Sequence, residues 1–579
     1  MLHRLLLVVV LAFFTVSFWA SHLKKRDLAI ANSPSGDYEP VKTSCPNGPS
    51  LRYSETGQSR LSDAELTYVA EKAAKSIPLW RQYLERVNLE DFDVEKFLAK
   101  AESTGGGRFF PKFGFAFSGG GVRALCLGAS IIEAFDGRNP DAVEARIGGL
   151  IQLATYASGL SGGAWMLGSW ATSNFPRLPL LNQTLWRLTE ENDLWDWNIA
   201  KEYPDVLHVV KQKKKAGYPV SFVDAWGRIV ARHFINDAEE GKGVLWSSIR
   251  ETSGYKNREY PFVIVLSVSR PSPRQPVSIR SPVYEYSAED FTVWNPHLNA
   301  SIPIQFLGTP APSTKIGGIC VNGFDNAGFI MGMSSNILTA MDGPPQKRGF
   351  FFGLMRLFTH DDAFEGKVPN TFQGLGASPP ARFPDSDTDT LLMADGGSAS
   401  ENIPMFPLIQ PIRELDVIIA VDSTAEEKDP IQNHAIGYPN GTSLYMTYQK
   451  TQLPEYSGYR FPKIPNSLDG TFVKLGYNKR PTFFGCHDTP ATPLIIYLPN
   501  YGAVAQTDSK SSQTTYDGDL IGKYFANGFA IASQSAGPTQ DPEWPACLAC
   551  ALIDRQLIRN GTPRTAQCDH CFQKYCAAP

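Results

Sequence analysis

The sequence lacks a surplus of charge of either sign. Its 579 residues include 54 lysines and arginines against 58 aspartates and glutamates, which gives a formal net charge of -4 at pH 7. Proteins that bind phosphate-rich polymers concentrate positive charge on an arm, a helix or a patch, and no such segment stands out here. We therefore expect no nucleic-acid partner, and no obligate protein partner is predicted.

Long apolar runs are scarce as well, apart from one at the N-terminus. His3 and Arg4 precede an apolar run from Leu5 to Ala20, which is shorter than the roughly 20 residues of a membrane-spanning helix and resembles a secretory signal. We expect a signal peptide over residues 1–21, followed over 22–44 by a short pro-segment or a flexible N-terminus. An uncleaved signal anchor is the alternative.

The C-terminus has no apolar tail that would direct a glycolipid anchor. The sequence thus predicts a secreted, extracellular protein, with the cell surface or a vacuole as other destinations. Four Asn-x-Ser/Thr sequons are candidate glycosylation sites in that pathway, namely Asn182, Asn299, Asn440 and Asn560.

Cysteine is sparse, with nine residues in the chain, but five of them lie close to the C-terminus: Cys547, Cys550, Cys568, Cys571 and Cys576. Their spacing fits either a zinc ribbon or a disulfide-bonded tail. Behind a signal peptide we favour disulfides. Cys126 lies in an apolar helical run and is expected to be a buried thiol, which leaves eight cysteines to pair. No metal and no cofactor are predicted.

A strand, a glycine turn and a helix follow one another twice. Residues 113–117 read as a strand, Gly119-Gly120-Gly121 as a turn, and the next residues to about 135 as a helix; residues 150–156 read as a second strand, Gly159 to Gly163 as a second turn, and residues from 164 as a second helix start. Two helices are expected within residues 61–98, further strands at 260–267, 390–394, 416–420 and 493–498, and long loops at 366–389 and 457–466.

Alternation of strands and helices is typical of an α/β fold. We predict a mainly parallel central sheet covered by helices on both faces, with a disulfide-rich C-terminal tail. One catalytic domain would extend over residues 45–579.

The second turn has the pattern of a nucleophile. In Gly159-x-Ser161-x-Gly163 a serine lies at a sharp strand-to-helix turn, where flanking side chains would collide with neighbouring backbone. The first turn places the N–H groups of Gly120 and Gly121 at a helix N-terminus, a source of donors for the oxyanion of an acyl-transfer intermediate. Dinucleotide or phosphate binding is the alternative for these glycines.

Two charged residues complete the candidate site. Asp395 ends an apolar strand before Gly396-Gly397 and could take the proton of Ser161 if burial raises its pKa; capping a turn is the alternative role. Arg123 would place a permanent cation near the first glycine turn, able to hold a substrate phosphate, or it forms a structural salt bridge.

These elements, in this order, resemble the fungal lysophospholipase or phospholipase B family, whose catalytic region is similar to that of animal cytosolic phospholipase A and, more remotely, patatin. The matching motifs are Ser118-Gly-Gly-Gly-Val-Arg123, Gly159-Leu-Ser-Gly-Gly163 and Asp395-Gly-Gly397 with Asn402-Ile-Pro404. The resemblance extends from about Cys45 to the C-terminal cysteines. One departure is Ser398-Ala399-Ser400, where the family often has an acidic residue.

The resemblance implies a serine-aspartate dyad without histidine. Ser161 would be the nucleophile, Asp395 the base, the Gly120 and Gly121 amides the oxyanion hole, and Arg123 the phosphate contact. The substrates would be phospholipids and lysophospholipids at membrane or micelle surfaces, which are cleaved through an acyl-enzyme without metal or cofactor.

Two other interpretations fit the residues. A conventional Ser-Asp-His carboxylester lipase would use His434 or His487 as its base. An inactive secreted lipid- or metal-binding protein would carry the cysteine tail as a zinc module. In addition, the run Lys213-Lys214-Lys215 is expected to form a solvated face, or else to touch anionic membrane.

Overall fold

The computed structural model describes residues 29–578 apart from 47–50, 55–59, 104–109, 190–193, 195–198, 271, 273–274, 312–316, 337–363, 377–381 and 426–436. The predicted signal peptide therefore lies outside the described residues. Among the helices of the described part, none is long and apolar enough to cross a membrane.

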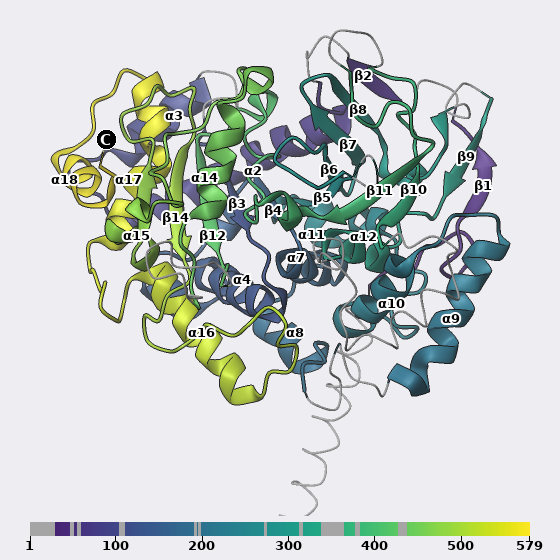
Figure 1. Ribbon diagram of the computed structural model, residues 1–579. Coiled ribbons are helices and arrows are strands. Elements are labelled where there is room, and N and C mark those ends of the chain that lie inside the picture. Colours follow the sequence, from purple (N-terminus) through teal and green to yellow (C-terminus); the bar gives the residue numbers. More distant parts are fainter. Residues whose placement is uncertain are drawn as a thin grey trace, which may run out of the picture.

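A large mixed sheet forms the centre of the molecule (Figure 1). Its five middle strands run parallel in the order β14 (Leu494–Pro499), β12 (Val417–Asp422), β3 (Phe113–Phe117), β4 (Tyr156–Gly159) and β5 (Phe262–Ser269). Every residue of these strands is buried. Because successive side chains of a strand point to opposite faces, both faces of the parallel part are covered.

Antiparallel strands extend this parallel centre on both sides. Beyond β5 lie β6 (Val283–Ser287), β7 (Asp290–Asn295), β8 (Leu298–Pro303) and β2 (Arg52–Ser54); β13 (Thr482–Phe484) flanks β14; and β10 (Gly366–Pro369) pairs with β11 (Thr390–Asp395), which pairs with β5. A separate two-stranded sheet joins β1 (Val41–Ser44) to β9 (Ile319–Asn322). The predicted parallel arrangement is therefore confirmed for the centre only.

Helices pack on the sheet through aromatic side chains. Trp80 of α2 (Asp63–Val87) contacts Phe113 of β3, and Phe135 of α4 (Gly121–Phe135) contacts Phe115, with ring centroids 6.0 and 5.6 Å apart. The two helices predicted within residues 61–98 are confirmed as α2 and α3. The α-helices are α2 (Asp63–Val87), α3 (Val94–Ser103), α4 (Gly121–Phe135), α5 (Pro140–Glu144), α6 (Leu150–Leu153), α7 (Gly162–Thr172), α8 (Leu178–Thr184), α9 (Ile199–Lys215), α10 (Phe222–Phe234), α11 (Ser253–Lys256), α12 (Ala327–Ser334), α14 (Thr442–Thr451), α15 (Thr471–Lys474), α16 (Gly518–Ser533), α17 (Trp544–Arg559) and α18 (Ala566–Tyr575).

Two local predictions were wrong. Residues 150–156 were expected to form one strand, but Leu150–Leu153 form α6 and the strand begins at Tyr156. A short, fully buried apolar run has no periodicity that separates helix from strand, and the positive φ of 96° at Gly149 starts a helical turn here. The predicted loop at 366–389 begins with β10, which gains its strand pairing from the distant β11.

The N-terminal segment is also more ordered than expected. A flexible N-terminus was one prediction for residues 22–44, yet β1 pairs with β9, and the Tyr38 hydroxyl donates to Asp224 Oδ1 at 2.9 Å from a buried position. Residues 29–44 therefore pack on the body of the protein.

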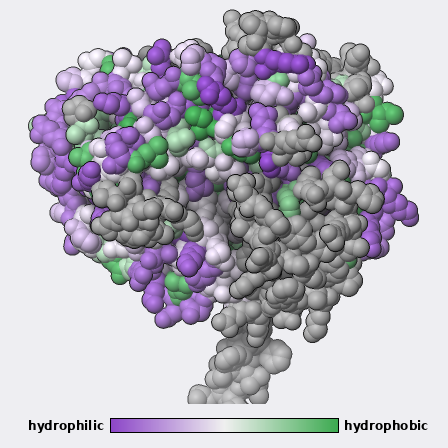
Figure 2. Space-filling view, in the orientation of Figure 1, coloured by the Kyte–Doolittle hydropathy of each residue, from purple (hydrophilic) through white to green (hydrophobic). Residues whose placement is uncertain are grey.

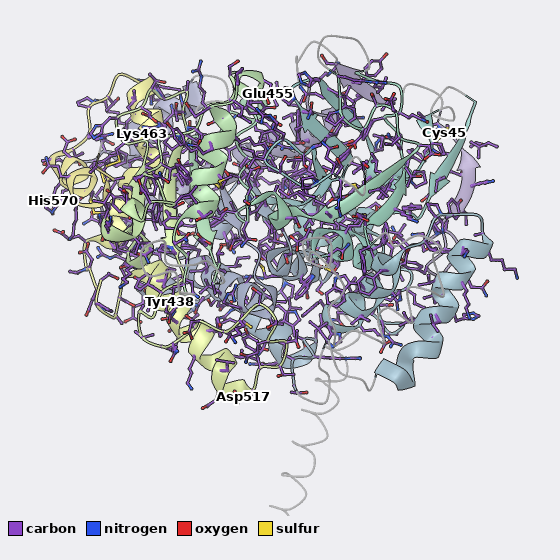
Figure 3. The ribbon with its side chains drawn as sticks, in the orientation of Figure 1. Cys45, Tyr438, Glu455, Lys463, Asp517 and His570 are labelled. Carbon is purple, nitrogen blue, oxygen red and sulfur yellow. A yellow bond between two sulfur atoms is a disulfide. The ribbon has the colours of Figure 1, made fainter. Side chains whose placement is uncertain are left out.

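Four disulfides confirm that eight cysteines pair: Cys45–Cys320, Cys486–Cys576, Cys547–Cys571 and Cys550–Cys568. Cys126 is a free, buried thiol, as predicted. Figure 3 places Cys45 and His570 of α18 on opposite sides of the molecule, so disulfides link the chain both near β9 and in the C-terminal helices. The thiols of the C-terminal cysteines are thus used in disulfide bonds rather than in a zinc ribbon.

The surface of the described residues is mixed in polarity. On the face drawn in Figure 2, hydrophilic side chains predominate and hydrophobic ones are interspersed among them. Lys213, the first residue of the basic run, is not part of a solvated face. It is 2% exposed, and its Nζ donates to Asp224 Oδ1 at 2.6 Å, whereas Lys214 and Lys215 are exposed.

Candidate active site

Ser161 and Asp395 meet because two strands end against the same edge of β5. Gly159 of β4 pairs with Val265 in the parallel direction, and Asp395 of β11 pairs with Ser267 in the antiparallel direction. The other edge of β5 is occupied by β6, so β4 and β11 share one edge and approach each other end to end. This arrangement brings the residue that ends β11 next to the turn that follows β4.

Ser161 lies in a strained turn between β4 and α7. Its φ and ψ are 51° and -125°, a combination that non-glycine residues rarely adopt. The Ser161 N–H donates to the carbonyl oxygen of Ser334, at the end of α12, at 3.0 Å. A Cβ added to Gly159 would lie 2.8 Å from the Gly163 carbonyl oxygen, and one on Gly163 would lie 2.7 Å from that of Phe117. Both flanking positions therefore require glycine, as the motif predicts.

The glycine turn after β3 is in backbone contact with the turn of Ser161. A Cβ added to Gly162 would lie 2.0 Å from the Gly121 carbonyl oxygen, and one on Gly119 would lie 3.0 Å from the Ser161 Cβ. Gly120 and Gly121 have φ angles of 139° and 63°, and α4 begins at Gly121. Within the described part of the chain, the N–H groups of these two residues donate to no protein acceptor. They are free donors at a helix N-terminus beside Ser161.

Asp395 is a buried carboxyl group with a perturbed pKa. It is 4% exposed, and its Oδ1 accepts a hydrogen bond from the Gly397 N–H at 2.8 Å. Burial raises the pKa of Asp395 from 3.8 to about 6, although hydrogen bonds from the Gly397 N–H and the Ser161 side chain partly offset the rise. A carboxylate with this pKa next to a serine hydroxyl can accept its proton near neutral pH.

Arg123 is fully buried beside the glycine turn. Its Nε donates to the Ser423 carbonyl oxygen at 2.6 Å and its Nη2 to Ser511 Oγ at 2.9 Å, and Nη1 donates to the Ser509 carbonyl oxygen. A Cβ added to Gly121 would lie 2.6 Å from the Ser511 carbonyl oxygen. The guanidinium therefore joins the glycine turn to the segment around Ser511, and its contact with a substrate phosphate stays a prediction.

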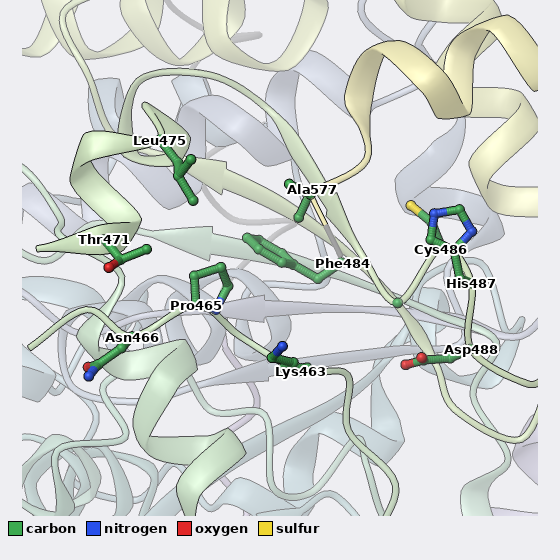
Figure 4. Close-up of a pocket in the computed structure, with 12 residues that line it drawn as sticks. Lys463, Pro465, Asn466, Thr471, Leu475, Phe484, Cys486, His487, Asp488 and Ala577 are labelled. Carbon is green, nitrogen blue, oxygen red and sulfur yellow. The ribbon is translucent and has the colours of Figure 1, made fainter. Parts of the chain in front are cut away.

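The structure separates His487 from Ser161. His487 follows β13, whose last residue Phe484 pairs with Ile495 at the amino end of β14. It lies at a cavity of about 510 Å³ that is also lined by Lys463 and Asp488 (Figure 4). Since β14 runs parallel to β12, β3 and β4, this cavity is at the opposite end of the strands from the Ser161 turn. His434 lies outside the described residues.

The sequons differ in exposure. Asn299 and Asn440 are 8% and 5% exposed, and Asn440 Oδ1 accepts a hydrogen bond from the Thr442 N–H at 2.9 Å. Asn182 and Asn560 are partly exposed. Glycosylation remains a prediction, and accessibility favours the latter two positions.

Sequence reasoning missed the residues that hold the two turns. The Gly119 N–H donates to the Asn402 carbonyl oxygen at 3.0 Å, and Asn402 Nδ2 donates back to the Gly119 carbonyl oxygen at 3.1 Å. The motif Asn402-Ile-Pro404 marked this position without giving it a role. No signal in the sequence indicated Ser334, whose carbonyl oxygen accepts from the Ser161 N–H.

Comparisons with known proteins identify the family. Residues 113–578 match the lysophospholipase catalytic domain. Lysophospholipase 1 of Aspergillus fumigatus is 33% identical, over 96% of this chain and 89% of that protein. Lysophospholipase 3 of Saccharomyces cerevisiae is 31% identical, over 95% and 82%.

Among solved structures, human GIVD cytosolic phospholipase A2 has a similar fold. The TM-score is 0.63 at 14% sequence identity, with 90% of this chain and 70% of that chain covered. The catalytic-domain match and the identity to the fungal proteins extend over most of the sequence. The chain therefore belongs to the lysophospholipase family of carboxylic ester hydrolases.

Proposed function

We propose that the protein is a secreted lysophospholipase of the phospholipase B type, which hydrolyses the fatty acyl esters of lysophospholipids and phospholipids through an acyl-enzyme on Ser161. One observation carries the proposal: Ser161 and the buried Asp395 meet at one edge of β5, beside the free N–H groups of Gly120 and Gly121. The N-terminal apolar run, which resembles a secretory signal, and the four disulfides support secretion.

Acylation begins when Asp395 accepts the hydroxyl proton of Ser161 while Oγ attacks the ester carbonyl carbon. The carbonyl oxygen becomes an oxyanion, which the N–H groups of Gly120 and Gly121 stabilise. As the tetrahedral intermediate collapses, the bond to the glycerol oxygen breaks and that oxygen takes the proton from Asp395. The glycerophospho-alcohol leaves when the substrate is a lysophospholipid, or the lysophospholipid leaves when it is a phospholipid, and the fatty acyl group remains on Ser161.

Deacylation repeats these steps with water. Asp395 takes a proton from the water molecule as its oxygen attacks the acyl carbon, and then returns the proton to Ser161 Oγ as the fatty acid leaves. A single carboxylate can serve both steps because its raised pKa lies near neutral pH. The cation of Arg123 would hold the substrate phosphate, which requires the segment around Ser511 to make room for it.

Release of fatty acid from lysophosphatidylcholine and phosphatidylcholine micelles tests the proposal. The secreted wild type is compared with Ser161→Ala and Asp395→Asn, with a chelator present. We expect both variants to lose at least about 1,000-fold in kcat, because each removes a group on which the chemical step depends. Near-normal activity of Asp395→Asn would refute its role as the base, and an inactive wild type would refute the hydrolase function.

A further inference from the structure

A turn outside the catalytic motifs lies directly beside the glycine turn. Strand β12 neighbours β3 with Val421 opposite Phe117, so the residues that follow β12 run next to those that follow β3. The Ser423 N–H donates to Ser118 Oγ at 2.6 Å, and the Ser118 N–H donates to the Val421 carbonyl oxygen at 3.1 Å. The two turns are thus hydrogen-bonded to each other at their starts.

A buried carboxylate organises this neighbouring turn. Asp422 is fully buried, and its Oδ1 accepts hydrogen bonds from the Thr424 N–H at 3.1 Å and from the Thr424 hydroxyl at 2.6 Å. Its Oδ2 accepts from the Tyr497 hydroxyl at 2.8 Å. Because the hydroxyl hydrogen of Thr424 is directed at Asp422, the oxygen of Thr424 is left to act as an acceptor.

Asn402 uses that acceptor. Its Nδ2 donates to Thr424 Oγ1 at 2.9 Å and to the Gly119 carbonyl oxygen at 3.1 Å. Because both acceptors need a donor, the amide nitrogen of Asn402 must face Thr424 and the Gly119 carbonyl oxygen. The amide oxygen Oδ1 therefore points away from them. Asn402 Oδ1 packs between the Gly119–Gly121 turn and the turn that follows Asp395, because a Cβ on Gly119 or Gly397 would lie 2.6 or 2.7 Å from it. Gly397 is the residue whose N–H bonds to Asp395.

We propose that Asp422 and Thr424 are positioning residues for ester hydrolysis, which act through Asn402 to hold the Gly119–Gly121 turn in register with Ser161 and Asp395. The inference rests on the proposed function. None of the three side chains needs to touch substrate: Asp422 orients Thr424, Thr424 orients the Asn402 amide, and Asn402 spaces the oxyanion donors from the base. Small displacements of such donors reduce transition-state stabilisation more than substrate binding.

Thr424→Val tests this series of hydrogen bonds, since valine keeps the shape of threonine and removes its hydroxyl. With lysophosphatidylcholine as substrate, we expect kcat to fall about 10- to 100-fold, less than the roughly 100- to 1,000-fold loss that follows complete removal of one oxyanion donor, and KM to change less than about twofold. Thr424→Ser, which keeps the hydroxyl, should restore kcat to within about threefold of wild type. The rate of inactivation by a long-chain alkyl fluorophosphonate, which reacts with the serine, should fall in parallel with kcat.

A matched control and a double variant separate positioning from stability. Thr371 is a fully buried threonine whose hydroxyl donates to the Thr309 carbonyl oxygen at 2.7 Å, and Thr371→Val should keep kcat near wild type. If Thr424 acts through Asn402, adding Thr424→Val to Asn402→Ala should change kcat by less than about twofold.

Three results would overturn the inference. The first is full kcat in Thr424→Val while Ser161→Ala is inactive, and the second is a double variant whose losses multiply. The third, for use if Thr424→Val does not fold, is full kcat in Asn402→Ala. An inactive wild type would instead refute the proposed function, and this inference would then fail as well.

Discussion

Replacing the proposed base by a neutral isostere should make the protein inactive and more stable at the same time. The pKa of Asp395 is raised from 3.8 to about 6 by burial, so the folded state holds its ionised form unfavourably. A difference of about 2 pKa units corresponds to about 3 kcal/mol of stability at pH 7. Asp395→Asn removes the charge and keeps the shape, so it should recover most of that amount.

Because the pKa of Asp395 is raised on folding, the stability difference between wild type and Asp395→Asn should depend on pH. As the pH rises above about 4, the unfolded state releases the Asp395 proton while the folded state keeps it until about 6, so wild-type stability falls across this interval. Below pH 4 both states hold the proton, and the variant should have no advantage. Above pH 6 the full difference should be present.

Thermal unfolding from pH 3.5 to 7.5 measures this difference. For a chain of this length, about 3 kcal/mol corresponds to a rise in Tm of about 2–3 °C at pH 7. Ser161→Ala is the matched control: it is expected to be inactive but keeps the carboxyl group, so its stability should still fall as the pH rises, over a range that extends to higher pH because the hydrogen bond from Ser161 no longer offsets the effect of burial on the pKa of Asp395. An Asp395→Asn variant whose Tm difference from wild type is constant across the pH range would refute the argument that Asp395 is a desolvated carboxylate.

Three further predictions concern activity. The kcat/KM for lysophosphatidylcholine should fall about tenfold per pH unit below about pH 6, as Asp395 becomes protonated and loses its ability to accept a proton; a profile flat down to pH 4.5 would contradict this. Gly162→Ala should reduce kcat by at least about 100-fold, because its Cβ would lie 2.0 Å from the Gly121 carbonyl oxygen and push the two turns apart, while Gly458→Ala, where a Cβ meets nothing within 4 Å, should match wild type in the same assay. His487→Ala should retain at least half of wild-type kcat, because His487 lies at the opposite end of the strands from Ser161; a near-complete loss of activity at unchanged Tm would revive the histidine triad.

Local sequence was enough for β3, the strand that leads into the first glycine turn. The run Phe-Gly-Phe-Ala-Phe predicted β3 to its exact residues, 113–117, since a fully apolar run bounded by a glycine turn is typical of a buried parallel strand. The eight paired cysteines and the free Cys126 also agreed with the prediction. Where the signal was weak the prediction failed, as at residues 150–153, because apolarity alone does not distinguish a buried helix from a buried strand.

Apart from β11, which was predicted at residues 390–394, the antiparallel strands could not be identified in this way. Their pairing depends on partners distant in sequence, as β10 pairs with β11 and β2 with β8. Short strands with mixed composition have little preference of their own and gain their hydrogen bonds only from a neighbouring strand. The sequence therefore indicated the centre of the sheet and left its edges undetermined.

The sequence by itself determined which chemical groups are available: a serine between glycines at a strand-to-helix turn, a run of glycines that opens a helix, and an aspartate that ends a strand. Such turns are local, because steric contact within a few residues dictates glycine at each position. Only the tertiary structure decided that β4 and β11 end against the same edge of β5, that burial raises the pKa of Asp395, and that the Asn402 side chain lies between Gly119 and Gly397. These properties depend on desolvation and on contacts between distant segments, and they arise only when the whole chain has folded.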